Sequence, residues 1–223
     1  PGLLLLAMFF FAANAMNSAV QTAEKNITAR ALESDEVASS ILASSLKREV
    51  EGRMDELRKI AADPRLTSAI QAGNANGWQE RSSLRELLNK ERKRLDPRQV
   101  LDASWFICDA NGFQRWRSPN RESTIDQDWS HRDYFHGLGS GFDPVSIQPI
   151  EKPHVSEAFQ SRATNQMMVA LSVPVRDEAG TIIGVLARTT HLGQLLAEYK
   201  PSIHGQYGVE RTMSLIDDRT WQL

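Results

Sequence analysis

Apolar residues three and four positions apart dominate the chain between residues 24 and 62. This stretch has no proline, and oppositely charged pairs such as Glu49 and Arg53 stand four apart on the other side. The pattern predicts an amphipathic helix over 24–62, about 60 Å long. Two shorter helices joined by a loop would produce a similar pattern. One small domain cannot cover a helix of that length, so we expect part of it to form a stalk or a dimer contact. The apolar positions are Ile27, Ala31, Val37, Ala38, Ile41, Leu42, Leu46, Val50, Met54, Leu57, Ile60 and Ala61.

The preceding residues are uncharged up to Glu24 and include an apolar run from Leu3 to Ala13. This run is shorter than the roughly 20 residues that a membrane-spanning helix needs. We favour a partial transmembrane segment over 1–23, because no proline or glycine interrupts the passage into the next helix. Two other readings remain open: the hydrophobic region of a signal peptide with a cleavage site at Ala13–Asn14–Ala15, and a buried core helix.

Two further helices are predicted after residue 62. Asp63 and Pro64 suit the start of a short helix that ends at Gly73. After a glycine- and asparagine-rich turn, a second helix is predicted from about Trp78 to Leu95. Its lysines and arginines outnumber its acidic residues, which a solvated face explains more simply than an anion site.

The hydrophobic pattern changes to short apolar runs and tight turns after Pro97. Runs at 105–108 and 113–117, separated by Asp109–Gly112, predict a hairpin, and runs at 167–175 and 181–189 predict another. We also predict a strand over 145–150, a helix over 191–199 and a strand over 211–217, with an irregular stretch at 118–143. Helices followed by a meander of antiparallel strands indicate an α+β fold.

Composition and motifs narrow the function. The chain has 223 residues, 41% of them hydrophobic, a formal net charge of −2 and a single cysteine, Cys108. A nucleic-acid partner is not expected without a basic footprint, and one cysteine excludes an intrachain disulfide and a thiolate zinc cluster. The glycines at 137–141 lack the strand and lysine of a phosphate loop, and no paired-histidine zinc motif is present. We therefore expect no metal, cofactor or catalytic group. The hypotheses are a sensory domain of a membrane receptor, an enzyme domain with an unrecognised site, and a coiled-coil stalk with a head.

Several short motifs, in this order, resemble a Cache domain. They are a strand–turn–strand with Asp109 and Gly112, the run Arg132–Asp133–Tyr134–Phe135, and a strand pair running from Pro174 to Leu186. The resemblance covers about 27–217. It implies a long N-terminal helix packed on a PAS-like antiparallel sheet of five or six strands. The implied organisation is a partial transmembrane segment (1–23), a signalling helix (24–62), a membrane-distal Cache module (63–210) and the start of a second module (211–223).

The same resemblance implies an extracytoplasmic ligand sensor of a bacterial receptor in the cell membrane, with one or two membrane passes and a homodimer contact through the long helix. The stretches 153–161 and 169–175 are similar to Cache sensors fused to serine/threonine protein kinases. Related sensors serve chemotaxis receptors, histidine kinases and diguanylate cyclases, and these outputs remain alternatives.

The resemblance also indicates ligand contacts. Arg132, Tyr134 and Phe135 stand at the R-x-W-Y positions of amino-acid-binding members, in which a later aspartate holds the amine. Here 187–190 contains no acid, so the expected ligand is a small organic acid. Arginine grips a carboxylate with two parallel N–H donors, and Trp105, Trp116 and Trp129 are candidate walls. Alternatively, Arg132 pairs with Asp133 or another acid and only braces the loop, and Trp105 and Phe106 are plain core residues.

Overall fold

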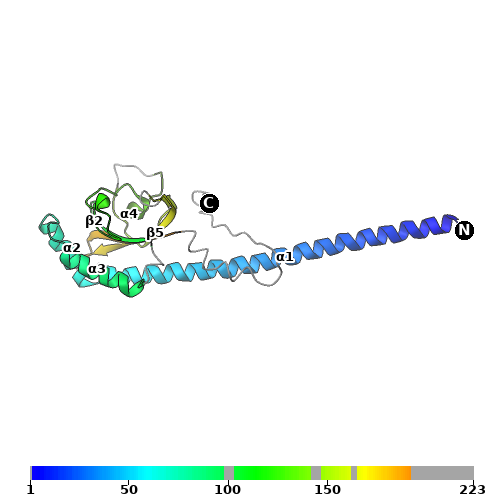
Figure 1. Ribbon diagram of the computed structural model, residues 1–223, viewed down its shortest axis with the longest axis horizontal. Helices are drawn as coiled ribbons and strands as arrows, with labels where there is room; N and C mark the ends of the chain where they lie inside the picture. The colour runs from blue at the N-terminus through cyan, green and yellow to red at the C-terminus, as the bar shows by residue number, and fades with distance from the viewer. Residues whose placement is uncertain (1, 98–102, 142–146, 162–164, 192–223) are drawn as a thin grey trace. The chain divides into compact units, whose positions relative to one another are not determined.

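A computed structural model of the chain describes residues 2–97, 103–141, 147–161 and 165–191 (Figure 1). Three helices come first and a sheet follows, which is the predicted α+β order. The elements are α1 (Gly2–Ala61), α2 (Pro64–Ala75), α3 (Ser82–Leu95), β1 (Ser104–Asp109), β2 (Gln114–Ser118), the 3-10 helix η1 (Glu122–Thr124), α4 (Asp133–His136), β3 (His154–Val155), β4 (Phe159–Gln160), β5 (Met167–Arg176) and β6 (Ile182–His191).

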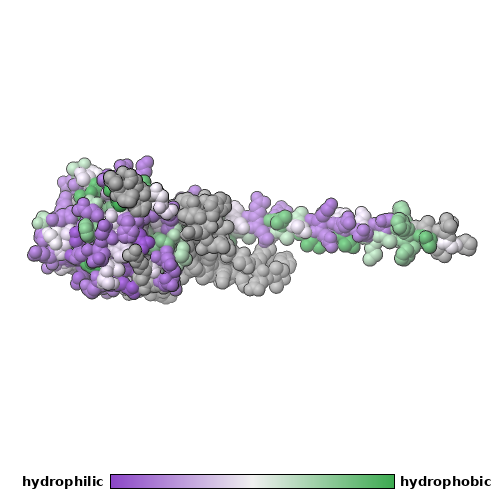
Figure 2. Space-filling model, turned by 90° about the horizontal axis from the view of Figure 1, so that it is seen from above, coloured by the Kyte–Doolittle hydropathy of each residue, from purple (hydrophilic) through white to green (hydrophobic). Residues whose placement is uncertain are grey.

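Helix α1 is continuous from Gly2 to Ala61, so the region 24–62 forms one helix rather than two. The chain divides into two compact units, residues 1–47 and 48–223. In the first unit the apolar side chains of Ile27, Leu32 and Ile41 are each more than 60% exposed. Figure 2 shows green hydrophobic patches among purple polar residues along this helix. None of the described helices contains a segment long and apolar enough to cross a bilayer.

Helices α2 and α3 differ in how well their boundaries were predicted. The Asp63 side chain accepts a hydrogen bond from the Arg65 backbone N–H (2.9 Å), and Pro64 is the first helical residue, as expected. The helix ends at Ala75, however, and not at Gly73. Helix α3 begins at Ser82 and not at Trp78, because Trp78 has a positive φ of 64°. Its indole lies against Gly73, where an added Cβ would come within 2.6 Å of the ring. Trp78 therefore closes the α2–α3 turn instead of starting a helix.

The strands form one antiparallel sheet in the order β2-β1-β6-β5-β3, and β4 also pairs with β5. The predicted sheet of five or six strands and both hairpins are confirmed. The expected strand over 145–150 is wrong in its described part, since 147–150 is not a strand; the Ile150 N–H instead donates to the Phe135 carbonyl in α4. The predictions for 192–199 and 211–217 lie outside the described residues, and His191 ends β6.

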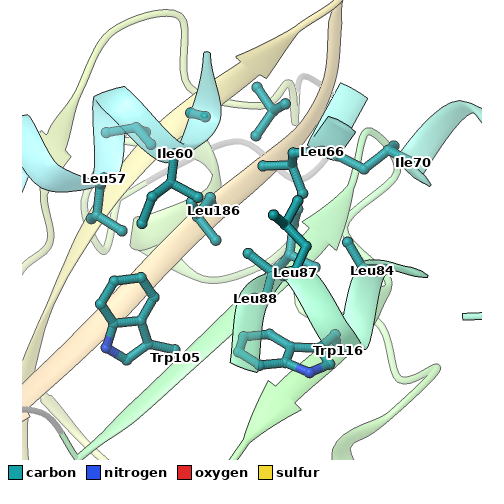
Figure 3. Packing of buried hydrophobic residues seen from close by; sticks show 14 of the residues in the cluster. Leu57, Ile60, Leu66, Ile70, Leu84, Leu87, Leu88, Trp105, Trp116 and Leu186 are labelled. Atoms are coloured by element: carbon teal, nitrogen blue, oxygen red, sulfur yellow. The ribbon is translucent and has the colours of Figure 1, made fainter. Parts of the chain in front are cut away.

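Alternate residues of the strands point to opposite faces of the sheet. The face that we call the helix face packs against α2, α3 and the end of α1, and Figure 3 shows Leu57, Leu88, Trp105 and Leu186 in this core. The other face, which we call the loop face, is covered by α4 and irregular segments and holds a smaller apolar cluster that includes Phe106 and Phe135. Strands β1 and β6 therefore each contribute side chains to both cores, one set on each face of the sheet.

Candidate functional site

A cavity of about 50 Å³ lies on the loop face, where β1, β2, β5 and β6 meet the irregular segment before α4. We call it the loop-face cavity. Aromatic rings, hydroxyl groups and two arginines form its wall, and no aspartate or glutamate is among the described residues that line it. These residues are Ser104, Phe106, Gln114, Arg117, Thr124, Trp129, Arg132, Tyr134, Phe159, Ser161, Met168 and Thr189.

A β-bulge in the β1–β2 hairpin places two of the polar groups in this wall. Ile107 pairs with Trp116 and Cys108 pairs with Gln114, so Arg115 is an extra residue between them. The bulge puts Gln114 on the same face as Arg117. The Gln114 amide donates to Thr124 Oγ1 (2.6 Å) and to the Thr124 carbonyl (3.1 Å), which also accepts from the Trp129 indole N–H (3.2 Å). These bonds anchor the irregular segment over the sheet.

Arg132 reaches this cavity between two aromatic rings. Its guanidinium carbon lies 5.7 Å from the centre of the Trp129 ring and 5.6 Å from that of Phe159, both within cation–π range. Its Nε is buried and has no hydrogen-bond partner among the described residues, and the same holds for Nε of Arg117. A buried N–H donor without a partner is unfavourable. The two arginines therefore give this cavity a positive charge that no described lining carboxylate balances.

Asp133 does not neutralise Arg132. Its carboxylate accepts hydrogen bonds from the backbone N–H groups of Gly139 (2.8 Å) and Glu157 (2.7 Å) and contacts Nε2 of His154 at 2.9 Å. Burial alone would raise the pKa of Asp133, but these three hydrogen bonds outweigh it and hold the pKa at about 2. Through these bonds Asp133 braces the loop.

The six predicted ligand contacts separate into three groups. Arg132, Tyr134 and Trp129 line the loop-face cavity, and the Tyr134 ring lies edge-on to Phe106 with centroids 4.9 Å apart. Phe135 is buried in the loop-face cluster and does not line the cavity. Trp105 and Trp116 point to the helix face and belong to its core. Strand alternation explains this, because Phe106 and Arg117 occupy the positions that face the cavity.

Several lining residues were not predicted as contacts, among them Ser104, Gln114 and Thr189. The sequence does contain a signal for them, since polar side chains interrupt otherwise apolar strands. The sequence alone does not show which face of the sheet these polar residues share, because that depends on the register of the strands.

Other chemistry finds little support in the described residues. No cluster of histidine, cysteine, aspartate and glutamate side chains in this part of the chain could hold a metal ion. Cys108 is buried in the sheet, and burial raises the pKa of its thiol far above the usual range, which makes it a poor nucleophile.

No family model and no curated protein match this sequence. Among solved structures, the ligand-binding domain of the Pseudomonas aeruginosa chemoreceptor PctB, in complex with L-arginine, matches 70% of this chain and 56% of its own, with 15% identity and a TM-score of 0.50. The corresponding domain of Pseudomonas fluorescens CtaA with L-leucine matches 71% and 56%, at 17% identity and a TM-score of 0.50. The sensor domain of the V. cholerae histidine kinase DctB matches 71% and 57%, at 16% identity and 0.47.

The chain thus spans little more than half the length of these domains. A long N-terminal helix and, within the described residues, a six-stranded antiparallel sheet define a Cache-type, PAS-like fold. Its structural neighbours are ligand-binding sensor domains of chemoreceptors and of a histidine kinase.

Proposed function

We propose that this chain is the extracytoplasmic sensor region of a transmembrane receptor and that the loop-face cavity binds the carboxylate of a small organic acid. The observation that carries the proposal is Arg132, whose buried Nε lacks a partner while its guanidinium is held between Trp129 and Phe159. A carboxylate would satisfy this donor and a neighbouring N–H in a bidentate contact.

The absence of an acid in the described wall bears on the class of ligand. An ammonium group needs a carboxylate or an aromatic cage, and the cavity already holds the cations Arg117 and Arg132. We therefore propose a carboxylate ligand without an α-amino group. PctB and CtaA were solved with amino acids, so an amino-acid ligand is the alternative that binding experiments must address.

The size of the cavity suggests how binding produces a signal. Ligand pockets usually measure about 300–1,000 Å³, whereas this cavity measures about 50 Å³. A ligand must therefore displace part of the covering segment. We propose that this displacement shifts the equilibrium between two arrangements of the loop face.

Strand β6 offers a path from this cavity to α1. Thr189 lines the cavity, and both of its neighbours contact the helix: Arg188 pairs with Glu56 at 2.6 Å, and Arg53 donates to Thr190 Oγ1 at 3.3 Å. Arg188 is almost fully buried and stacks over Trp105 with a centroid distance of 4.9 Å. A shift of β6 on ligand binding would move these contacts, and α1 would carry the change towards the membrane.

The receptor context rests on the sequence and remains part of the proposal. Residues 1–23 would form part of a membrane anchor, and the exposed apolar residues of 24–47 would form a parallel homodimer contact. The proposed output domain is a serine/threonine protein kinase, although none of the named neighbours supports it. Those neighbours come from chemoreceptors and a histidine kinase, so a chemotaxis or histidine-kinase output agrees better with them. The full open reading frame would identify the output domain.

A binding screen tests the ligand proposal. Small carboxylates and amino acids are screened by thermal shift, and hits are measured by calorimetry. Loss of a charge-assisted hydrogen bond is worth about 1.5–3 kcal/mol, so Arg132→Ala should weaken a carboxylate about ten- to a hundred-fold. Arg132→Lys should restore binding only in part because the planar fork is lost. Arg30→Ala, at an exposed site on α1, serves as the control with the same charge change.

Two results would overturn the proposal. One is an amino acid that binds more tightly than any carboxylate lacking the amine. The other is a carboxylate whose affinity does not change in a folded Arg132→Ala variant.

A further inference from the structure

A second concave site lies at the edge of the sheet, and its lining residues include several from α3 and from the edge strand β2. We call it the arginine cleft. Its volume is about 310 Å³, within the range of pockets that hold small molecules. Its wall combines four arginines with neutral polar side chains and one carboxylate. The lining residues are Arg81, Arg85, Asn89, Arg115, Trp116, Arg117, Ser118, Asn120, Glu122 and Ile125.

Two of the four arginines are already paired. Asp126 accepts from Arg81 and from Arg115 at 2.6 Å each, and Asp109 holds Arg115 from the other side at 2.7 Å. Arg115 is further positioned over the Trp78 ring, with a centroid distance of 5.1 Å. These two arginines therefore form a fixed frame, and their charges are largely balanced.

Arg85 and Arg117 are different, since neither makes a salt bridge with a described residue, although Arg85 and Glu80 attract each other electrostatically. Arg85 is exposed on α3 and opens into the cleft. Arg117 has a buried Nε without a partner. Burial and the nearby charges of Arg121 and Arg92 lower the pKa of Arg117. The inner end of the cleft thus gathers positive charges from two elements that are distant in the sequence.

We propose that the arginine cleft binds a small molecule with a multiply charged oxyanion, such as a phosphate or a polycarboxylate group. Arg85 and Arg117 would grip the anion from α3 and β2, because guanidinium forks match the geometry of such oxyanions. Asn89 supplies a neutral donor in the same wall, whereas the Asn120 amide already donates to Glu122 Oε1 at 2.7 Å. The fold places Arg85 on α3 and Arg117 on β2 in the wall of one cleft. A helix face that is only solvated would not need an arginine from a strand beside it.

This site is separate from the one in the proposed function, although the two share a wall. Arg85 lines only the arginine cleft, Arg132 lines only the loop-face cavity, and Arg117 lines both. An anion that draws the Arg117 guanidinium into the cleft removes a cation from the cavity. We therefore expect negative coupling between the two ligands, and linkage makes that coupling equal in both directions.

Calorimetry with inorganic pyrophosphate on the whole chain, at constant ionic strength set with chloride, tests the proposal. Saturable binding is expected, and Arg85→Gln and Arg117→Gln should each weaken it about tenfold or more. Lys90→Gln removes one positive charge from an exposed position on the same helix outside the cleft, and it should change affinity by less than about twofold because solvent screens such charges. Arg132→Ala should also leave pyrophosphate binding intact, so failure of one site is distinguishable from failure of the other.

The proposal is wrong if pyrophosphate binds without saturation, or if Lys90→Gln weakens it as much as Arg85→Gln does. Either result would indicate general attraction to a basic surface. Should Arg117→Gln fail to fold, Arg85→Gln still decides the question, because the Arg85 side chain is exposed and its loss removes no core contact.

Discussion

The two faces of the sheet are built from neighbouring residues of the same strands, yet they carry different chemistry. On the helix face, Trp105, Ile107 and Leu186 pack into an apolar core under regular helices. On the loop face, the adjacent positions include Ser104 and Thr189, whose hydroxyl groups lie 2.8 Å apart. The first face removes a large apolar area from water, and the second leaves polar groups around a cavity.

The two faces therefore differ in how they are held together. On the helix face, regularly spaced side chains of the helices pack closely against the sheet. Such close packing tolerates few changes in side-chain volume. The loop face is covered by a segment that specific hydrogen bonds hold, such as those of Gln114 and Asp133. A few such bonds can rearrange without opening the main core.

The largest loss of stability is expected from the helix face. Trp105→Ala should lower the free energy of unfolding by about 3–5 kcal/mol, since Trp105 is completely buried in the larger core. Trp129→Ala, a matched change on the loop face, should lower it by less than half as much, because Trp129 is only partly buried. Urea denaturation measures both. Equal losses would show that the two faces contribute equally to stability.

The next effect concerns the brace of the loop face. Asp133→Asn should lower the free energy of unfolding by roughly 2 kcal/mol at pH 7, because the folded pKa of about 2 lies below the usual 3.8. A depressed carboxyl pKa stabilises the folded state above pH 4, and that stabilisation disappears as the pH falls from about 4 to about 2. Denaturation curves of both proteins should therefore converge in this range. The exposed control Asp55→Asn should show a smaller difference at pH 7, and a constant gap for Asp133→Asn would contradict the role of its charge.

A smaller effect is expected at the start of α2, which covers the helix face. Asp63→Ala should reduce stability by about 1 kcal/mol, because the side-chain acceptor at the N-cap is lost. Asp63→Asn keeps an oxygen at the same position and should retain most of the stability. Thermal unfolding distinguishes the two variants, and equal melting temperatures would argue against the cap.

The smallest effect on stability is expected at Arg132 itself. Its Nε makes no hydrogen bond to a described residue, so Arg132→Ala removes only cation–π contacts, worth about 0.5–1 kcal/mol each, and relieves a partly buried charge. The free energy of unfolding should stay within about 1 kcal/mol of the wild-type value while the affinity for a carboxylate falls about ten- to a hundred-fold. A loss of more than about 2 kcal/mol would instead show that Arg132 supports the loop.

Local patterns predicted the regular elements well. The apolar spacing of 24–62 and the Asp63–Pro64 signal indicated α1 and α2, and two turn motifs indicated both hairpins. The short elements α4, β3 and β4 were missed because elements of two to four residues have no periodicity to detect. The strand expected over 145–150 had the right composition, but the backbone of Ile150 bonds to α4 instead of to a strand.

The candidate site was predictable only where its chemistry is local in the sequence. The run from Arg132 to Phe135 marked a candidate loop by itself, and three of the six expected contacts line the cavity. Which neighbour in each strand faces that cavity depends on where the helices pack and on the bulge at Arg115, because a change of one position reverses the direction of every side chain. For the same reason only the tertiary structure decided that Trp105 and Trp116 join the core, and that Arg117 faces both the loop-face cavity and the arginine cleft.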